Sequence, residues 1–411
     1  MSAHRWIVFL ACFTLFIQAA LEISAGQEIE PMKSDVGSCY PFLKSLADHS
    51  PLSLSLLTRP WGDLEKWRTE GRARMFELLE YNPPPVPFEA VVLESRQKDG
   101  YTRQLVRYAV APGRWTEAFL LIPDGLKGPA PAVIALHDHG GYYYYGKEKI
   151  TETEISTPSL QEHIAESYQG QCFADQLVRR GYVVLVPDCF YFGSQRLAPD
   201  EVAAPFPDSL KGLTPGEDAF IREFNAFASR HESLMAKTFF MSGTTWPGVM
   251  FQDDRASLSY LLSRSEVDPE RVGCMGLSIG GFRSAHLFGL DSRIKAGVVA
   301  GWMTTYADLL FDHLRNHTWM LYIPRQYAFL DLPDVVGLNA PQPLLVVNCS
   351  KDQLFTLEGM RAAEKKIQDI YTHFGAPDRF RCNFYDVPHC LNQQMQQDAF
   401  EWLDTNLKNS R

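Results

Sequence analysis

The sequence Gly276-Leu277-Ser278-Ile279-Gly280 joins an apolar, strand-like run, Arg271–Met275, to a helix-like one. Gly-x-Ser-x-Gly between a strand and a helix is typical of a nucleophile elbow, in which a serine occupies a strained turn and projects from the sheet. Small residues two positions before and after the serine let the neighbouring backbones approach without a Cβ clash. The motif predicts Ser278 as a nucleophile, although a glycine-rich turn without chemistry has the same pattern.

Asp352 and His389, which follow Ser278 in the sequence, have the residue types and the order that such a serine needs. A nucleophilic serine requires a base to take its proton, and the base requires an acid to fix its tautomer. The apolar run 343–348 predicts a buried strand with Asp352 on the loop beyond it, and 380–387 predicts another strand followed by His389. Loops of this kind gather at the carboxyl edge of an open α/β sheet. We therefore expect Ser278, Asp352 and His389 to converge as nucleophile, acid and base.

Acyl transfer also needs two N–H donors aimed at the oxyanion. The first is expected from the backbone of Ile279, the residue after the nucleophile. The apolar run 131–136 leads into His137-Asp138-His139-Gly140-Gly141, and paired glycines suit a loop that turns its N–H groups inward. We assign the second donor to the backbone of His139. A metal site on this loop is the alternative, but adjacent side chains at a strand exit point apart and no further ligand cluster follows. No metal or other cofactor is expected.

These motifs together resemble the α/β-hydrolase superfamily, more narrowly the branch of acetyl xylan esterases and dienelactone hydrolase-like esterases, with likeness to the prolyl oligopeptidase catalytic domain. The resemblance covers roughly Phe88 to the C-terminus. It implies a Ser-Asp-His triad and an acyl-enzyme intermediate. Many relatives carry glycine where Asp138 stands, and dienelactone hydrolases use a cysteine nucleophile where this chain has Ser278. The substrate of dienelactone hydrolases is therefore not expected here.

The alternation of strand-like and helix-like runs predicts an α/β fold with a mostly parallel central sheet flanked by helices. Three antiparallel leading strands, near residues 88–95, 102–109 and 116–122, are expected at one edge. Residues 27–87 are expected to form an N-terminal helical extension that ends in a proline-rich linker, and 88–411 the catalytic domain.

The segment 189–248 is long for a connection, so a partial cap over the site is expected. Asp188, at a strand exit, is interpreted as a structural partner of Arg196. The cap residues Gln195, Phe206, Phe239 and Trp246 are candidate substrate contacts among which the sequence does not choose.

The N-terminus has the pattern of a secretory signal peptide, assigned to residues 1–26. An apolar run, Trp6–Leu21, follows a short segment containing one arginine and is too short for a comfortable membrane span. An uncleaved anchor is the alternative. The prediction is a secreted or periplasmic protein without a stable membrane anchor.

Charge and cysteine content add two constraints. The formal net charge of −10, with no basic stripe, argues against a nucleic-acid partner. Seven cysteines would remain after cleavage, an odd and scattered set unlike a disulfide framework. Bridges between Cys349 and Cys390, or between Cys172 and Cys189, are left open. Oligomeric state is not predicted.

Aromatic residues near the expected site bear on the substrate. Tyr142, the first of four consecutive tyrosines after the oxyanion loop, could stack on a sugar or simply pack inward, and Trp302 is a candidate wall of the acyl pocket. The resemblance and the signal peptide together imply a serine esterase acting on small-molecule or polysaccharide esters, with acetylated polysaccharide as the leading class. A prolyl oligopeptidase-like peptidase is one alternative, disfavoured because the chain before Phe88 is too short for a β-propeller. A non-catalytic carbohydrate-binding relative is the other.

Overall fold

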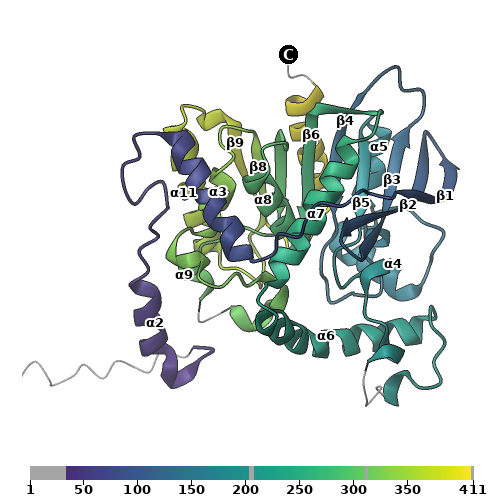
Figure 1. Cartoon of the computed structure of the whole chain (residues 1–411), viewed down its shortest axis with the longest axis horizontal. Helices are drawn as coiled ribbons and strands as arrows, with labels where there is room; N and C mark the ends of the chain where they lie inside the picture. The colour runs from purple at the N-terminus through teal and green to yellow at the C-terminus, as the bar shows by residue number, and fades with distance from the viewer. Residues whose placement is uncertain (1–33, 203–207, 311–312, 409–411) are drawn as a thin grey trace, which may run out of the picture. The chain divides into compact units, whose positions relative to one another are not determined.

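The computed structural model describes residues 34–202, 208–310 and 313–408. The chain divides into two compact units, residues 1–49 and residues 50–411. The first contains the short helix α2 (Tyr40–Asp48), and the second contains the sheet and the other helices (Figure 1). The predicted signal peptide, residues 1–26, lies outside the described residues. Within the described ranges, no helix is long and apolar enough to cross a membrane.

A single sheet organises the second unit, and its described part has nine strands in the order β1-β2-β3-β5-β4-β6-β7-β8-β9. Strands β1 to β3 and the β3–β5 pair are antiparallel, and every other pair is parallel. This confirms the predicted α/β fold with antiparallel leading strands at one edge. The strands are β1 (Val91–Lys98), β2 (Tyr101–Ala111), β3 (Arg114–Pro123), β4 (Ala130–Leu136), β5 (Val183–Pro187), β6 (Val267–Leu277), β7 (Ala296–Ala300), β8 (Leu344–Cys349) and β9 (Phe380–Tyr385).

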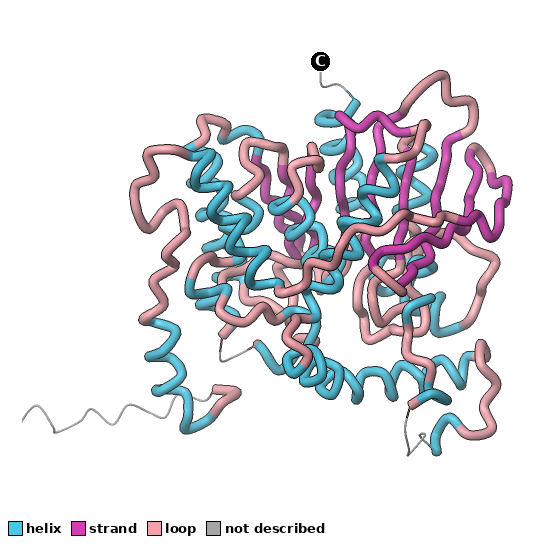
Figure 2. Tube along the Cα trace, in the orientation of Figure 1, coloured by secondary structure: helices cyan, strands magenta, loops and turns pink. Residues whose placement is uncertain are grey.

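The central strands are apolar on both faces because helices cover both faces (Figure 2). All seven residues of β4 are buried. Its side chains alternate between two apolar clusters, with Ile134 and Leu136 in one and Val133 and Ala135 in the other. The sheet therefore separates two cores, and the loops at its carboxyl edge are held by packing from both sides.

The helices of the second unit match the predicted periodic segments in part. They are α3 (Leu64–Leu79), α4 (Pro158–Tyr168), α5 (Phe173–Arg179), α6 (Asp218–Met241), α7 (Trp246–Leu262), α8 (Ile279–Leu290), α9 (Tyr306–Leu309), α10 (Leu332–Gly337), α11 (Leu357–His373) and α12 (Gln393–Leu403). Helices α5 and α12 contribute to the cluster that holds Val133, whereas α3, α7, α8 and α11 contribute to the one that holds Ile134.

The segment 189–248 contains more regular structure than its composition indicates. It includes the 24-residue helix α6, and α7 begins at Trp246. The Thr245 hydroxyl accepts a hydrogen bond from the Gly248 N–H at 3.0 Å, which caps the start of α7. The division into an extension up to Pro87, a catalytic domain and a cap stays a prediction.

Candidate active site

Ser278 occupies the sharp turn between strand β6 and helix α8. Its backbone has φ 60° and ψ −120°, a conformation that L-residues rarely adopt. The flanking glycines are required by space, because a Cβ on Gly276 would lie 2.4 Å from the Gly280 carbonyl oxygen and one on Gly280 would lie 2.1 Å from that of Leu136. The local sequence thus places the Ser278 side chain at the carboxyl edge of the sheet.

Asp352 and His389 meet on the loops that follow β8 and β9. Asp352 Oδ2 lies 2.6 Å from His389 Nδ1, and Asp352 Oδ1 accepts the Leu354 N–H at 2.8 Å. The carboxylate therefore assigns the proton to Nδ1 and leaves Nε2 as an acceptor. Among the described residues, His389 Nε2 is buried and has no hydrogen-bond partner.

The two expected oxyanion donors lie at the same end of the sheet. Ile279 is the first residue of α8, so its N–H has no acceptor within the helix. His139 follows β4, and among the described residues its backbone N–H donates to no acceptor. The structure therefore has two backbone N–H groups near Ser278 that are free for a ligand.

One pocket of about 240 Å³ brings these groups together. Ser278, Ile279, His139 and His389 all line it. Its remaining walls are Asp138, Gly140, Gly141, Ser167, Leu277, Trp302, Asn316, His317, Thr318, Leu321, Leu354 and Phe355. The apolar part of this wall contains Trp302, whose ring meets Phe355 edge to face at 5.3 Å.

Tyr142 is not among the residues that line this pocket. Its hydroxyl lies 2.5 Å from Ser159 Oγ, and its ring stacks on the imidazole of His163 with centroids 5.3 Å apart. These contacts match the packing alternative for the tyrosine run. Trp302 lies where an acyl-pocket wall was expected.

Comparison with known proteins agrees with this fold. Residues 167–306 match the dienelactone hydrolase family, and residues 41–196 match an Abhydrolase family. The structure is similar to one described as a "putative acetyl xylan esterase" from Bacteroides fragilis, with TM-score 0.65 and 17% identity over 86% of this chain and 84% of that one. This chain has the α/β-hydrolase fold. A glucuronoyl esterase from Solibacter usitatus is also similar, with TM-score 0.58 and 16% identity over 87% of this chain and 97% of that one.

Most of this chain also matches a curated relative. It is 28% identical to "Putative hydrolase YtaP" of Bacillus subtilis (strain 168) over 344 residues, which cover 82% of this chain and 98% of the relative. The likeness therefore extends over most of this chain and nearly all of the relative.

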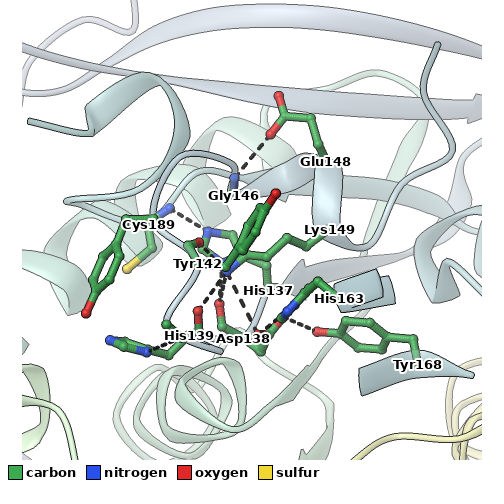
Figure 3. A network of polar contacts seen from close by, with 12 residues as sticks. His137, Asp138, His139, Tyr142, Gly146, Glu148, Lys149, His163, Tyr168 and Cys189 are labelled. Atoms are coloured by element: carbon green, nitrogen blue, oxygen red, sulfur yellow. Dashed lines mark hydrogen bonds and ion pairs between the residues drawn. The ribbon is translucent and has the colours of Figure 1, made fainter. Parts of the chain in front are cut away.

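Sequence reasoning missed the group that holds the oxyanion loop of this α/β-hydrolase, the ammonium of Lys149 (Figure 3). Lys149 is fully buried and donates to the carbonyl oxygens of Asp138, His139 and Tyr142. Burial lowers the pKa of this lysine. Three hydrogen bonds from one ammonium to backbone carbonyls fix the conformation of this loop. They therefore hold the backbone N–H of His139 in position.

Asp138, where many relatives have glycine, belongs to the same support. Its Oδ1 accepts the Tyr168 hydroxyl at 2.6 Å, and its Oδ2 lies 3.1 Å from His163 Nε2. Burial alone would raise the pKa of Asp138, but His163 and Lys149 beside it hold that pKa well below its ordinary value. The carboxylate thus anchors the loop to α4.

The metal alternative for this loop does not fit the contacts of His137. Its Nδ1 donates to the Asp138 carbonyl at 2.9 Å, and its Nε2 accepts the Cys189 N–H at 3.1 Å. Both ring nitrogens are occupied by backbone. Within the described ranges, no group of three or more His, Cys, Asp or Glu is placed to hold a metal ion.

The predicted pairing of Asp188 with Arg196 is wrong. Asp188 Oδ2 lies 2.8 Å from Lys147 Nζ, and its carboxylate also accepts the backbone N–H groups of Lys147 and Ser194. Arg196 instead donates to the Gly193 carbonyl and lies over the ring of Tyr144. Asp188 pairs with Lys147 because the ammonium of Lys147 is buried beside it, where leaving that charge unpaired would cost free energy of folding.

The seven described cysteines are free thiols. Cys349 and Cys390, which flank the acid and base loops, are both buried, and the Cys349 thiol donates to the Cys390 carbonyl at 3.4 Å. The loop that carries His389 is thereby tied to the end of β8 through a thiol.

Proposed function

We propose that this α/β-hydrolase is a secreted serine esterase that cleaves short-acyl esters, with acetyl esters of carbohydrates as the leading class. The observation that carries the proposal is the convergence of Ser278, the Asp352–His389 pair and two free backbone N–H groups on one small pocket. Support for the ester class comes from the similar structures, which by their printed names include a putative acetyl xylan esterase and a glucuronoyl esterase.

Each residue has a defined part in the proposed reaction. Ser278 Oγ attacks the acyl carbonyl carbon while His389 Nε2 takes its proton, and the N–H groups of Ile279 and His139 stabilise the oxyanion. The carbon–oxygen bond to the alcohol then breaks, and His389 donates the proton to the departing oxygen. Water, deprotonated by His389, hydrolyses the acyl-enzyme and releases the acid. Asp352 orients the imidazole and stabilises its charged form.

Pocket size and charge favour a small, neutral acyl group. A volume of about 240 Å³ lies below the range of about 300–1,000 Å³ usual for drug-sized ligands, and the described lining contains no lysine or arginine. Two carboxylates, Asp138 and Asp352, lie at or behind the site. A negatively charged acyl group would have no cation to pair with here.

Labelling with a fluorophosphonate probe tests the nucleophile directly. We expect the wild type to be labelled and to hydrolyse p-nitrophenyl acetate faster than butyrate, and Ser278→Ala to lose both activities. Ser284→Ala is the matched control, since Ser284 lies on the same helix and its hydroxyl has no hydrogen-bond partner among the described residues. Labelling that survives in Ser278→Ala would refute the assignment.

Substrate class is tested separately. Acetylated xylan should release acetate, whereas a methyl ester of glucuronic acid, with its bulky acyl group, and aminoacyl amides should be turned over slowly or not at all. Faster turnover of the glucuronate ester would contradict the acyl-size argument. Faster turnover of the amides would support the peptidase alternative, and binding of sugar without any turnover would support the non-catalytic one.

A further inference from the structure

Helix α6 brings one buried carboxylate, that of Glu232, against two loops that line the pocket. Glu232 Oε1 lies 2.8 Å from His139 Nε2, from the Tyr143 hydroxyl and from Thr318 Oγ1. Its Oε2 accepts the Trp319 N–H at 3.0 Å. His139 belongs to the oxyanion loop and Thr318 to the opposite wall, so a single side chain spans both.

The direction of each hydrogen bond follows from the partners. His139 Nδ1 accepts the Gly141 N–H at 2.9 Å, so the ring proton lies on Nε2 and is donated to Glu232. Thr318 Oγ1 accepts the Met320 N–H, which leaves its own proton for the carboxylate. The Trp319 backbone group can only donate. Glu232 therefore accepts hydrogen bonds at both oxygens, as suits an ionised carboxylate.

The charge of Glu232 is held by hydrogen bonds rather than by a strong cation. Among the described residues it forms no ion pair with lysine or arginine, and its basic neighbour is the imidazole of His139. Burial alone would raise the pKa of Glu232, but the hydrogen bonds from His139, Tyr143 and Trp319 lower it below its ordinary value. A buried carboxylate that accepts four hydrogen bonds holds its donors in fixed positions, because moving any donor away leaves part of the negative charge without a hydrogen bond.

We propose that Glu232 is a positioning residue of the esterase site, which sets the His139 N–H of the oxyanion hole and the Thr318 wall relative to Ser278. The inference rests on the proposed function. It also gives α6 a role. This helix lies in the long connection between β5 and α7, and it supplies the Glu232 carboxylate. Glu232 itself is not among the residues that line the pocket, so it acts through the two loops.

Glu232→Gln is the sharpest variant, because the change keeps shape and removes charge. An amide NH₂ must face one of the donors that the carboxylate accepts, so one loop has to move. We expect kcat for p-nitrophenyl acetate, per fluorophosphonate-titrated site, to fall about 10-fold to 100-fold with KM changed less than threefold, since losing an oxyanion donor outright costs about 10²–10³. The rate of fluorophosphonate labelling should fall in parallel, because the phosphonyl oxygen also needs the oxyanion donors.

Two further variants separate positioning from folding. Glu223→Gln, on the same helix, neutralises a carboxylate that forms no ion pair among the described residues, and should match the wild type. Tyr143→Phe removes one donor to Glu232 but keeps the ring that stacks on Phe192 at 5.2 Å, and should lower kcat about threefold to tenfold.

The outcomes distinguish this inference from the function on which it rests. A labelled, active wild type combined with a Glu232→Gln kcat per titrated site within twofold of wild type overturns the inference alone, even if fewer sites titrate. The same holds if KM rises and kcat does not change. A folded wild type that is not labelled at Ser278 overturns the proposed function and the inference together.

Discussion

Three histidines line the pocket, and their hydrogen bonds assign them different tasks. His139 uses both ring nitrogens, one toward Gly141 and one toward Glu232. His317 Nε2 donates to the Leu354 carbonyl at 3.0 Å, and burial lowers its pKa to about 4, so it is neutral near pH 7. Only His389 combines a carboxylate on one nitrogen with a buried, unbonded second nitrogen in the described structure. In the proposed reaction His389 is therefore the residue that receives the Ser278 proton.

A fourth histidine predicts a specific loss of stability in acid. His286 on α8 donates from Nδ1 to the Phe282 carbonyl at 2.9 Å, and burial lowers its pKa to about 4. The unfolded chain, with a pKa near 6.5, binds this proton at higher pH than the folded one, so stability falls as pH drops from about 6.5 to 4. We expect about 2 kcal/mol to be lost between pH 7 and pH 5 through this residue.

The comparison of wild type with His286→Leu isolates that contribution. Guanidinium unfolding at pH 7 and pH 5 should show that the wild type loses about 2 kcal/mol more than the variant. Other buried histidines, such as His137, contribute equally to both proteins and cancel in the difference. An identical pH dependence of the two proteins would show that His286 is not buried neutral in the folded state.

At the scale of elements, the sequence predicted the parts that local pattern controls. Buried parallel strands such as β4 and β8 are short apolar runs bounded by turn residues, and the elbow glycines mark a junction that tolerates no Cβ. Because parallel strands end at one edge of a sheet, the sequence predicts that Asp352 and His389 lie close together, and in the structure they are 2.6 Å apart.

The contacts that the sequence did not predict join residues that lie far apart along the chain. Lys149 looks like an ordinary surface lysine until the loop carbonyls of Asp138 and Tyr142 surround it. Glu232 lies on a helix with alternating charges, and its partner Thr318 is 86 residues away in sequence. The Asp188–Arg196 pairing failed for the same reason, since proximity in sequence did not reveal the buried Lys147. One clue was present, because a charged residue among the buried positions of α6 calls for a partner.

The junction of β6 and α8 predicts the effect of a single methyl group. A Cβ on Gly280 would lie 2.1 Å from the Leu136 carbonyl oxygen and 2.9 Å from that of His137, so Gly280→Ala must separate α8 from β4. We expect a loss of about 2 kcal/mol or more, with a fall in fluorophosphonate labelling because the Ile279 N–H moves with the helix. Gly62→Ala is the control, since nothing lies within 4 Å of its added Cβ. Equal melting temperatures for the two variants would contradict this packing argument.

At the scale of the whole molecule, residues 50–87, before the first strand, belong to the second unit, and α3 contributes to its core. Helix α3 buries Trp67, Met75, Leu78 and Leu79. Trp67 Nε1 donates to the Leu54 carbonyl at 2.8 Å, and Arg72 binds the Gly289 carbonyl at the end of α8 at 3.0 Å. Burying four large apolar side chains is worth roughly 6–12 kcal/mol as an upper bound, which is comparable to the whole stability of a typical domain. The helix is therefore a structural part of the second unit.

Two shortened chains test that conclusion. A chain that begins at Ser50 keeps α3 with its contacts, whereas one that begins at Phe88 removes it and uncovers the apolar cluster on that face of the sheet. We expect the first to unfold cooperatively and to be labelled at Ser278, and the second to aggregate or to lack a cooperative transition. Trp67→Ala in the full chain gives the graded version, with an expected loss of about 3–5 kcal/mol. If the chain from Phe88 matched the melting temperature and labelling of the chain from Ser50, α3 would be a dispensable extension, and the boundary predicted after Pro87 would mark the catalytic domain. If the chain from Phe88 instead melts at a lower temperature and loses labelling, α3 stabilises α8, the helix that follows Ser278. Arg72 on α3 binds the Gly289 carbonyl at the end of α8 and so joins the two helices.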